Sequence, residues 1–210
     1  MKGYISIISY YFYRLMIDPL LVGVRKIIKD LIEPNSTVID IGCGTGELVF
    51  YLSSQAKKVV GLDMNEEGLK YSRMKKRRLQ IGNVEFVSKD VNDSDFLSGT
   101  HFDYAVLSMV LHQFSLAEAN QVLNSARRVA KYIVMVDFSC PLPENAIGWG
   151  AKLIERMAGG QHYMHFKDYQ RRNGLNYFLD YHQLAIIENR VGGLGDIRII
   201  KALAKNSQES

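Results

Sequence analysis

The chain has 210 residues, 47% of them hydrophobic and 23% charged, which is enough to bury a core and too apolar for a disordered protein. Its net charge of +4 permits an anionic partner without requiring one. The two cysteines, Cys43 and Cys140, exclude a disulfide framework and suit a reducing cytoplasm. These values predict one cytoplasmic globular domain.

The first residues are unusually apolar. Residues 3–13, GYISIISYYFY, carry no formal charge, yet the run is too short to span a bilayer and no small-residue cleavage site follows it. We expect residues 1–19 to form a helical lid over a pocket. The alternative is an interfacial helix that makes peripheral membrane contact, although the charged face that such helices carry is missing.

Strands and helices alternate through most of the chain. Strands are expected at 37–41, 58–63, 84–90, 102–108 and 131–138, and helices at 20–32, 47–56 and 65–80 and from 115 onward. Ser115 and Glu118 form a capping-box pattern at the start of the last helix. The alternation predicts βαβ units and a parallel sheet with helices on both faces.

The end of the chain has a different pattern. Residues 184–191 and 196–204 read as two strands joined by a tight turn at Gly192 and Gly193, which predicts an antiparallel hairpin at the end of the sheet. Residues 145–183 contain short helical patterns and form the longest insertion. We expect this insertion to be a roof over the substrate.

A glycine-rich turn follows the first strand in STVIDIGCGTGELVF, where Gly42, Gly44 and Gly46 precede a helix. A turn of this kind binds a nucleotide-like ligand at the carboxyl edge of a sheet. A dinucleotide fits poorly, because Glu47 stands where the dinucleotide pattern needs Gly or Ala and would repel a pyrophosphate. No Gly-Lys-Ser/Thr sequence follows, so the Walker pattern also fails.

S-adenosylmethionine (SAM) carries no phosphate and removes this conflict. Asp63 ends the second strand, 21 residues after Gly42, where a carboxylate can accept hydrogen bonds from ribose hydroxyls. Asp90 ends the third expected strand, where it can accept from an adenine amino group, and Asp40 lies near the methionine ammonium at the end of the first. Three acidic residues at adjacent strand ends suit a positively charged ligand.

The same segments resemble a known family. VIDIGCGTGEL resembles motif I of class I SAM-dependent methyltransferases, and VVGLDMNEEGL, VEFVSKDVND and FDYAVLSMVLHQF are similar to the motifs that follow. Over residues 20–205 the resemblance implies an α/β, Rossmann-like, seven-stranded sheet, mostly parallel with an antiparallel last strand. It implies SAM as cofactor and S-adenosylhomocysteine (SAH) as product. With Asp40, the implied cofactor-binding residues are Gly42, Cys43, Gly44 and Gly46 for the methionine part, Asp63 and Met64 for ribose and adenine, Asp90 and Val91 for the adenine edge, and Ser108 through its carbonyl.

The expected acceptor is a small molecule. LHQF and GGQHYMHFKDY resemble methyltransferases of the ubiquinone/menaquinone-biosynthesis-like type. The Arg-Asn signature of the quinone enzymes is replaced by MVLHQF, and Arg14 stands where relatives often have an acidic residue. The resemblance therefore does not imply a quinone as substrate. The motifs of amino-methylating, cytosine-C5, protein-arginine and arsenic enzymes are absent from the sequence.

His112 is the main candidate for acid–base chemistry, because it follows the fourth strand near the expected position of the transferred methyl. A histidine there can take a proton from a hydroxyl or amine at neutral pH. The alternative is a histidine that only packs, since methyl transfer can run on positioning alone. Tyr13, with Tyr10 and Tyr11, would supply an aromatic face or hydroxyl near the sulfonium, or only pack the lid.

Two other groups of residues have competing interpretations. The run RMKKRR, residues 73–78, could touch phosphates, but a solvated helix end is the preferred interpretation. His162 and His165 are three residues apart; we expect them to touch substrate rather than a metal, and we assign no metal ligand. The rival functions are a SAM-binding partner or regulatory protein without catalysis, and an RNA methyltransferase. No added RNA-binding domain is recognisable, which counts against nucleic acid as a partner.

Overall fold

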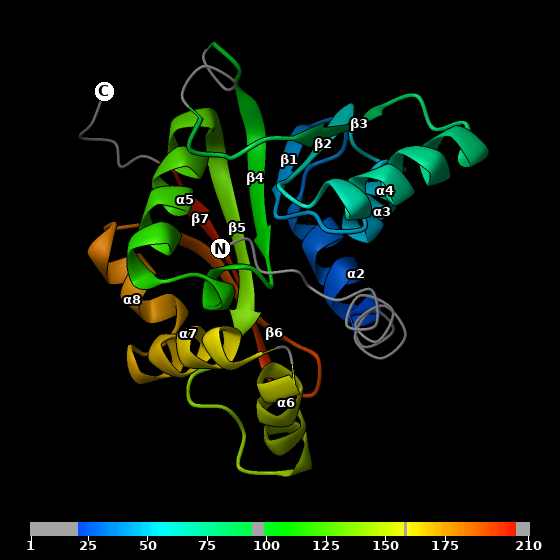
Figure 1. Cartoon of the computed structure of the whole chain (residues 1–210). Helices are drawn as coiled ribbons and strands as arrows, with labels where there is room; N and C mark the ends of the chain where they lie inside the picture. Colours follow the sequence, from blue (N-terminus) through cyan, green and yellow to red (C-terminus); the bar gives the residue numbers. More distant parts are fainter. Residues whose placement is uncertain (1–20, 94–98, 158, 205–210) are drawn as a thin grey trace.

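A computed structural model describes residues 21–93, 99–157 and 159–204. The described chain forms a seven-stranded sheet in the order β3-β2-β1-β4-β5-β7-β6, with helices packed around it (Figure 1). The strands are β1 (Thr37–Ile41), β2 (Lys58–Asp63), β3 (Val84–Ser88), β4 (Phe102–Ser108), β5 (Ala130–Phe138), β6 (Ile186–Gly192) and β7 (Ile197–Leu203). The helices are α2 (Val22–Leu31), α3 (Glu47–Leu52), α4 (Glu66–Leu79), the 3-10 turn η1 (Leu111–Gln113), α5 (Leu116–Val129), α6 (Ala146–Met157), α7 (Gly160–Arg171) and α8 (Leu175–Tyr181).

The sheet has the predicted topology. Strands β1 to β5 are parallel, whereas β7 runs antiparallel to both β5 and β6. The chain moves outward from β1 through β2 to β3 and then crosses back to β4 on the other side of β1. The order therefore reverses between β1 and β4, which is where open α/β sheets bind ligands. The expected Rossmann-like sheet with an antiparallel last strand is confirmed.

The central strands are buried on both faces. Four consecutive residues of β4, from Tyr104 to Leu107, are fully buried, as are Ile133 to Val136 of β5. A strand can bury consecutive side chains only when both sides of the sheet are covered. Figure 1 shows this cover, with α2, α3 and α4 on one side of the sheet and α5 and α8 on the other.

Several element ends differ from the sequence prediction. Helix α3 ends at Leu52 rather than residue 56, because Gln55 and Ala56 fold back and donate their backbone N–H groups to the Leu52 carbonyl. Strand β3 ends at Ser88, so Asp90 lies beyond it in a turn, where its Oδ1 accepts from the Asn92 N–H at 2.9 Å.

The capping box of α5 is confirmed. The Ser115 hydroxyl accepts from the Glu118 N–H, and the Glu118 carboxylate accepts from the Ser115 N–H at 2.9 Å.

The insertion at 145–183 contains α6, α7 and α8, as the helical patterns in its sequence predict. The expected lid at residues 1–19, with Tyr10, Tyr11, Tyr13 and Arg14, lies outside the described residues. In the part of the chain that is described, no helix has the length and apolar character needed to cross a membrane.

Candidate functional site

The glycine turn lies at the carboxyl end of β1, where the strand order reverses. Gly46 has a φ of 73°, and a Cβ added there would lie 2.5 Å from Cε1 of Phe86, so packing within the protein requires this glycine. Gly44 also has a positive φ, of 52°, but a Cβ added there would meet no atom of the described residues within 4 Å. As far as the structure describes the chain, the space beside Gly44 is therefore open to a ligand.

Asp63, the last residue of β2, is joined to this turn. Its Oδ2 accepts a hydrogen bond from the Gly44 N–H at 2.7 Å, and its Oδ1 accepts from the Asn65 N–H at 2.7 Å. An ionised carboxylate offers about four acceptor positions. The half-buried Asp63 thus fixes the turn and retains acceptor capacity for other donors.

Asp40 lies under the turn within β1 and is 2% exposed. Burial raises the pKa of Asp40 to about 7, the nearby charge of Asp63 acts in the same direction, and Arg25 opposes both. Asp40 therefore holds its proton more readily than an exposed aspartate does. Cys43 follows the strand, and burial raises the pKa of its thiol, so it is not a nucleophile at neutral pH.

Glu47, in the first turn of α3, is engaged by a neighbouring helix. Its carboxylate lies 2.6 Å from Nζ of Lys75, and both side chains are mostly buried. Arg73 pairs with Glu66 of its own helix, α4, at 2.6 Å, in a more exposed ion pair. Two cations of the basic run 73–78 are thus paired within the protein, which favours the interpretation of this run as an ordinary helix end.

The remaining predicted cofactor residues follow the ends of neighbouring strands. Met64 comes after β2 and is 71% exposed, Asp90 is exposed, and Val91 is buried. Ser108 ends β4 and is half-buried. The fold therefore places all of these positions at the carboxyl edge that carries the glycine turn.

His112 lies in η1 and contacts two acidic residues that the sequence analysis did not select. Its Nδ1 is 2.6 Å from Oδ1 of Asp137 in β5, and its backbone N–H donates to Oδ2 of the same residue at 3.1 Å. Its Nε2 is 3.5 Å from Oε1 of Glu155 in α6. The exposed fractions of His112, Asp137 and Glu155 are 1%, 0% and 7%. We call these three residues the buried cluster.

The charge state of His112 follows from these contacts. Burial alone would lower the pKa of His112, but Asp137 and Glu155 outweigh it and raise the pKa to about 10. At neutral pH the ring is then an imidazolium, with each N–H directed at a carboxylate. Such a ring has no lone pair with which to accept a substrate proton. The contacts favour a positioning role for His112, and its role as a base stays a prediction.

The sequence contains a weak indication of both Asp137 and Glu155. Asp137 is the only charged residue in the apolar run from Ile133 to Phe138. Glu155 follows Ala151 at helical spacing on the buried face of α6. A lone acid in a buried strand or on a buried helix face needs a partner.

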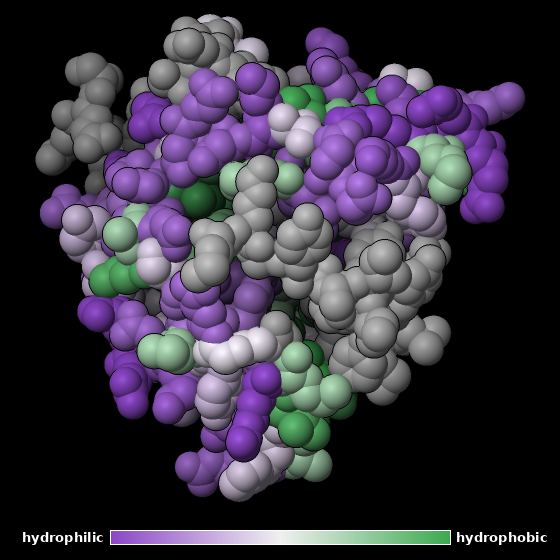
Figure 2. Space-filling model, in the orientation of Figure 1, coloured by the Kyte–Doolittle hydropathy of each residue, from purple (hydrophilic) through white to green (hydrophobic). Residues whose placement is uncertain are grey.

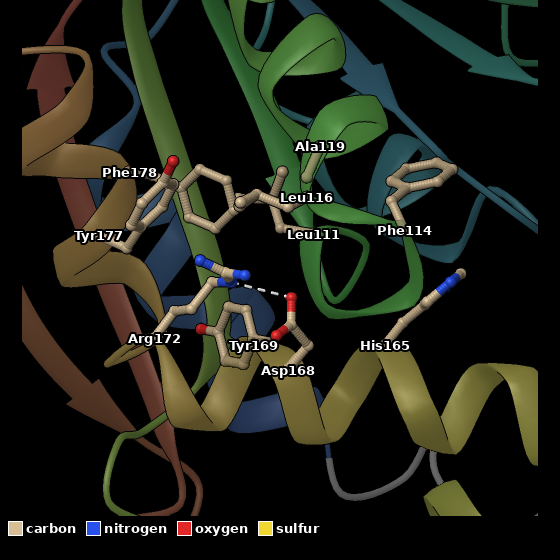
Figure 3. Close-up of a pocket in the computed structure, with 11 residues that line it drawn as sticks. Leu111, Phe114, Leu116, Ala119, His165, Asp168, Tyr169, Arg172, Tyr177 and Phe178 are labelled. Carbon is tan, nitrogen blue, oxygen red and sulfur yellow. Dashed lines mark hydrogen bonds and ion pairs between the residues drawn. The ribbon is translucent and has the colours of Figure 1, made fainter.

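A small pocket lies between η1, α5, α7 and α8 (Figure 3). Its walls are apolar and aromatic and include Leu111, Leu116 and Phe178. His165, Asp168 and Arg172 are its charged or ionisable lining residues, and Nε of Arg172 is 2.9 Å from Oδ2 of Asp168. Helices α7 and α8 of the insertion form part of its lining, and the pocket has room for about one water molecule.

The two roof histidines occupy different environments. His165 lines the pocket, and its Nδ1 is 2.8 Å from the carbonyl oxygen of Gln113. The Nδ1 atom of His162 is buried and has no hydrogen-bond partner among the described residues. Burial also lowers the pKa of His162. Within the described ranges, no group of three or more His, Cys, Asp or Glu side chains is arranged to hold a metal ion.

The fold and the glycine turn define a Rossmann-like domain of the class I SAM-dependent methyltransferase type. A family model described as a methyltransferase domain matches residues 32–174, well over half of the chain. The chain therefore belongs to this methyltransferase-domain family, and the resemblance seen in the sequence is confirmed.

Individual relatives agree with this assignment. The chain is 28% identical over 120 residues to a probable cobalt-precorrin-6B C(15)-methyltransferase of Methanobrevibacter smithii, covering 55% of this chain and 64% of that protein. It is 27% identical over 131 residues to the ubiquinone/menaquinone biosynthesis C-methyltransferase UbiE of Rickettsia prowazekii, covering 57% and 52%. The chain thus spans less than two thirds of the length of these relatives.

A solved structure extends the likeness of fold over nearly the whole chain. It is the magnesium protoporphyrin IX methyltransferase of Synechocystis PCC 6803 with bound SAH. The TM-score is 0.61 at 20% identity, over 97% of this chain and 90% of that chain.

Proposed function

We propose that this chain is a SAM-dependent methyltransferase that acts on a small molecule. The observation that carries the proposal is the hydrogen bond between Asp63 and the Gly44 N–H, beside open space at the carboxyl edge of the sheet. Glu47 adds to it, because it occupies the position where the dinucleotide-binding pattern needs Gly or Ala.

When bound, SAM supplies an electrophilic methyl group on a sulfonium. We infer that the open side of Gly44 receives the methionine part and that Asp63 accepts hydrogen bonds from the ribose hydroxyls. Asp40 would then face the ammonium group, since a buried acid with a raised pKa gains most from a cation. Gly42, Cys43 and Gly46 shape the turn, while Met64, Asp90, Val91 and the Ser108 carbonyl complete the proposed cofactor set.

The protein's contribution to the transfer step is positional. The nucleophile of the acceptor must lie in line with the bond between methyl and sulfur, and holding that geometry is worth about 7–11 kcal/mol of barrier. The buried cluster fixes η1 to β5 and α6, so it holds the segment that follows β4 beside the proposed methyl position. Tyr13 remains the proposed candidate for direct contact with the acceptor. His112 remains the proposed base only if the acceptor can reach its ring, which is 1% exposed.

A small-molecule acceptor is supported by the relatives, whose names give a cobalt-precorrin methyltransferase and a methyltransferase of ubiquinone and menaquinone biosynthesis. The basic run 73–78, on which an RNA methyltransferase would depend, has two cations paired within the protein. We also propose a cytoplasmic location, for which the two free cysteines give support.

The test uses SAM labelled on its methyl group, incubated with the protein and with cell extract split into small-molecule and RNA fractions. Label in the small-molecule fraction is the expected result. Label in RNA alone would replace the proposed substrate class, and SAM binding without any transfer would favour the catalytically inactive alternative. Asp63→Ala, which lacks the proposed ribose contact, is the control for transfer that does not depend on the site.

A further inference from the structure

Helix α6 exposes an apolar stripe on the face that points away from the core. Ala151 and Glu155 form its buried face, whereas Trp149, Leu153 and Met157 are 70%, 59% and 60% exposed. The three exposed residues are spaced four apart, so they lie along one line of the helix surface. A helix in the outer layer of a domain is normally polar on this side. Figure 2 shows the apolar side chains gathered over α6 at the bottom of the molecule.

Basic residues outnumber acidic ones around this stripe, where Glu144, just before α6, is the exposed acidic residue. Lys152 and Arg156 are the exposed charged residues of α6, and Lys167 and Arg171 are those of the adjoining α7. The other charged side chains of the two helices are Glu155, which is buried, and Asp168, which pairs with Arg172 at 2.9 Å. Helix α7 adds a further apolar side chain, Met164, at 69% exposure.

We propose that this α6–α7 surface docks on a lipid bilayer that carries anionic headgroups. Trp149, Leu153 and Met157 would enter the boundary between headgroups and acyl chains, and the basic residues beside them would meet the lipid phosphates. A tryptophan is well suited to this depth, because its ring is amphipathic. The arrangement differs from the expected contact through residues 1–19, since it uses a helix of the roof.

Two other occupants of the stripe fit the charges less well. Residues 1–20 are apolar, but their charged residues are Lys2, Arg14 and Asp18, so they give little negative charge to meet four basic side chains. A second copy in a twofold interface would bring the same patch against itself. The basic residues beside the stripe would then face their own counterparts.

Docking in this way would hold the roof of the candidate site against the bilayer. Glu155, on the opposite face of α6, is 3.5 Å from His112, so the helix that meets the lipid also contacts the buried cluster. The proposal does not depend on methyl transfer. Measurements of lipid binding are sufficient to support or overturn it.

The first test uses Trp149, the single tryptophan of the chain, as a built-in reporter. The full-length protein is mixed with vesicles of phosphatidylcholine, and separately with vesicles that also contain phosphatidylglycerol. We expect Trp149 emission to shift to shorter wavelength, and its quenching by acrylamide to fall, with the anionic vesicles only. Unchanged quenching with both vesicles would overturn the proposal. Shielding of Trp149 before any vesicle is added would also overturn it, in favour of residues 1–20 or a second copy.

The second test assigns the surface by sedimentation with the anionic vesicles. Leu153→Ser with Met157→Ser should weaken partitioning by at least about tenfold, because apolar area is lost at the lipid boundary. The matched control is Met74→Ser with Leu79→Ser, which removes two exposed apolar side chains beside the basic run of α4. Loss of binding in the α4 variant but not in the α6 variant would assign lipid contact to α4 and overturn the proposal. SAM binding by both variants checks that they are folded.

Discussion

The glycine turn and the roof each bury an ionisable group, Asp40 and His112, but the surroundings disfavour the charged form of Asp40 and stabilise the charged form of His112. At the turn, Asp40 is deprived of water, and the nearby charge of Asp63 raises its pKa further. At the roof, burial of His112 is outweighed by Asp137 and Glu155, which hold the ring in its charged form. The turn therefore gains stability when a cation binds, whereas the roof cluster already contains its own counter-charges. This difference supports the proposal that the turn binds the ligand and that the roof cluster positions η1.

The largest expected effect comes from the roof. His112→Ala leaves Asp137, which is fully buried, without its cationic partner. Removing one member of a buried ion pair costs about 3–5 kcal/mol, so the free energy of unfolding should fall by that amount in urea denaturation at neutral pH. His165→Ala is the control, because this half-buried ring has one hydrogen bond to Gln113 and its loss should cost about 1 kcal/mol. Equal effects in the two variants would show that the cluster is not ionic.

The pH dependence of stability tests the same cluster without a change of fold. The pKa of His112 is raised from 6.5 to about 10 in the folded state, so the folded protein binds this proton more tightly than the unfolded chain. Its stabilising contribution is complete below about pH 6.5 and is lost as the pH rises to about 10. The stability difference between wild type and His112→Ala should therefore shrink by a few kcal/mol over this range. A difference that stays constant from pH 6.5 to 10 would contradict the assigned charge state.

At the turn, Asp63→Ala should weaken SAM binding by at least about 1.5 kcal/mol, because hydrogen bonds to a charged acceptor are lost. Calorimetry measures this loss directly. Asp103→Ala is a matched control, since Asp103 lies near the start of β4 at the opposite edge of the sheet and accepts from the Thr37 N–H at 2.7 Å. If the two variants bind SAM equally well, Asp63 is not a ribose ligand.

The smallest predicted effect concerns Asp40. Its pKa of about 7 in the free protein should fall when a cation binds beside it, so binding releases a proton below pH 7. SAM affinity should therefore rise with pH, by at most about tenfold per unit, and level off above about pH 7. Asp40→Asn should remove this slope in calorimetry over a pH series. A slope that survives in Asp40→Asn belongs to another group.

The two ends also differ in how far the sequence predicts them. The turn is encoded locally, because strand, glycines and helix are contiguous and Asp63 follows within one βαβ unit. The bounds of β1, β2 and β4 were predicted correctly, since their apolar runs end at charged or turn residues. The end of α3 was not, because the turn after Leu52 depends on folded-back hydrogen bonds.

The roof cluster depends on contacts between distant segments. His112 and Asp137 are 25 residues apart, and Glu155 lies beyond them in a helix of the insertion. No short motif joins three such positions, so the sequence could select His112 as a candidate but could not supply its partners. Without those partners its charge state could not be predicted, and a base was the natural expectation.

The most direct test of the central claim is calorimetry of the full-length protein with SAM and, separately, with NADH. The open side of Gly44, the hydrogen-bonded Asp63 and the buried Asp40 favour a cationic ligand. Glu47 stands where a dinucleotide-binding turn needs Gly or Ala. We predict that SAM binds and that NADH does not. Binding of NADH without binding of SAM would contradict the assignment of this turn to a methyltransferase cofactor.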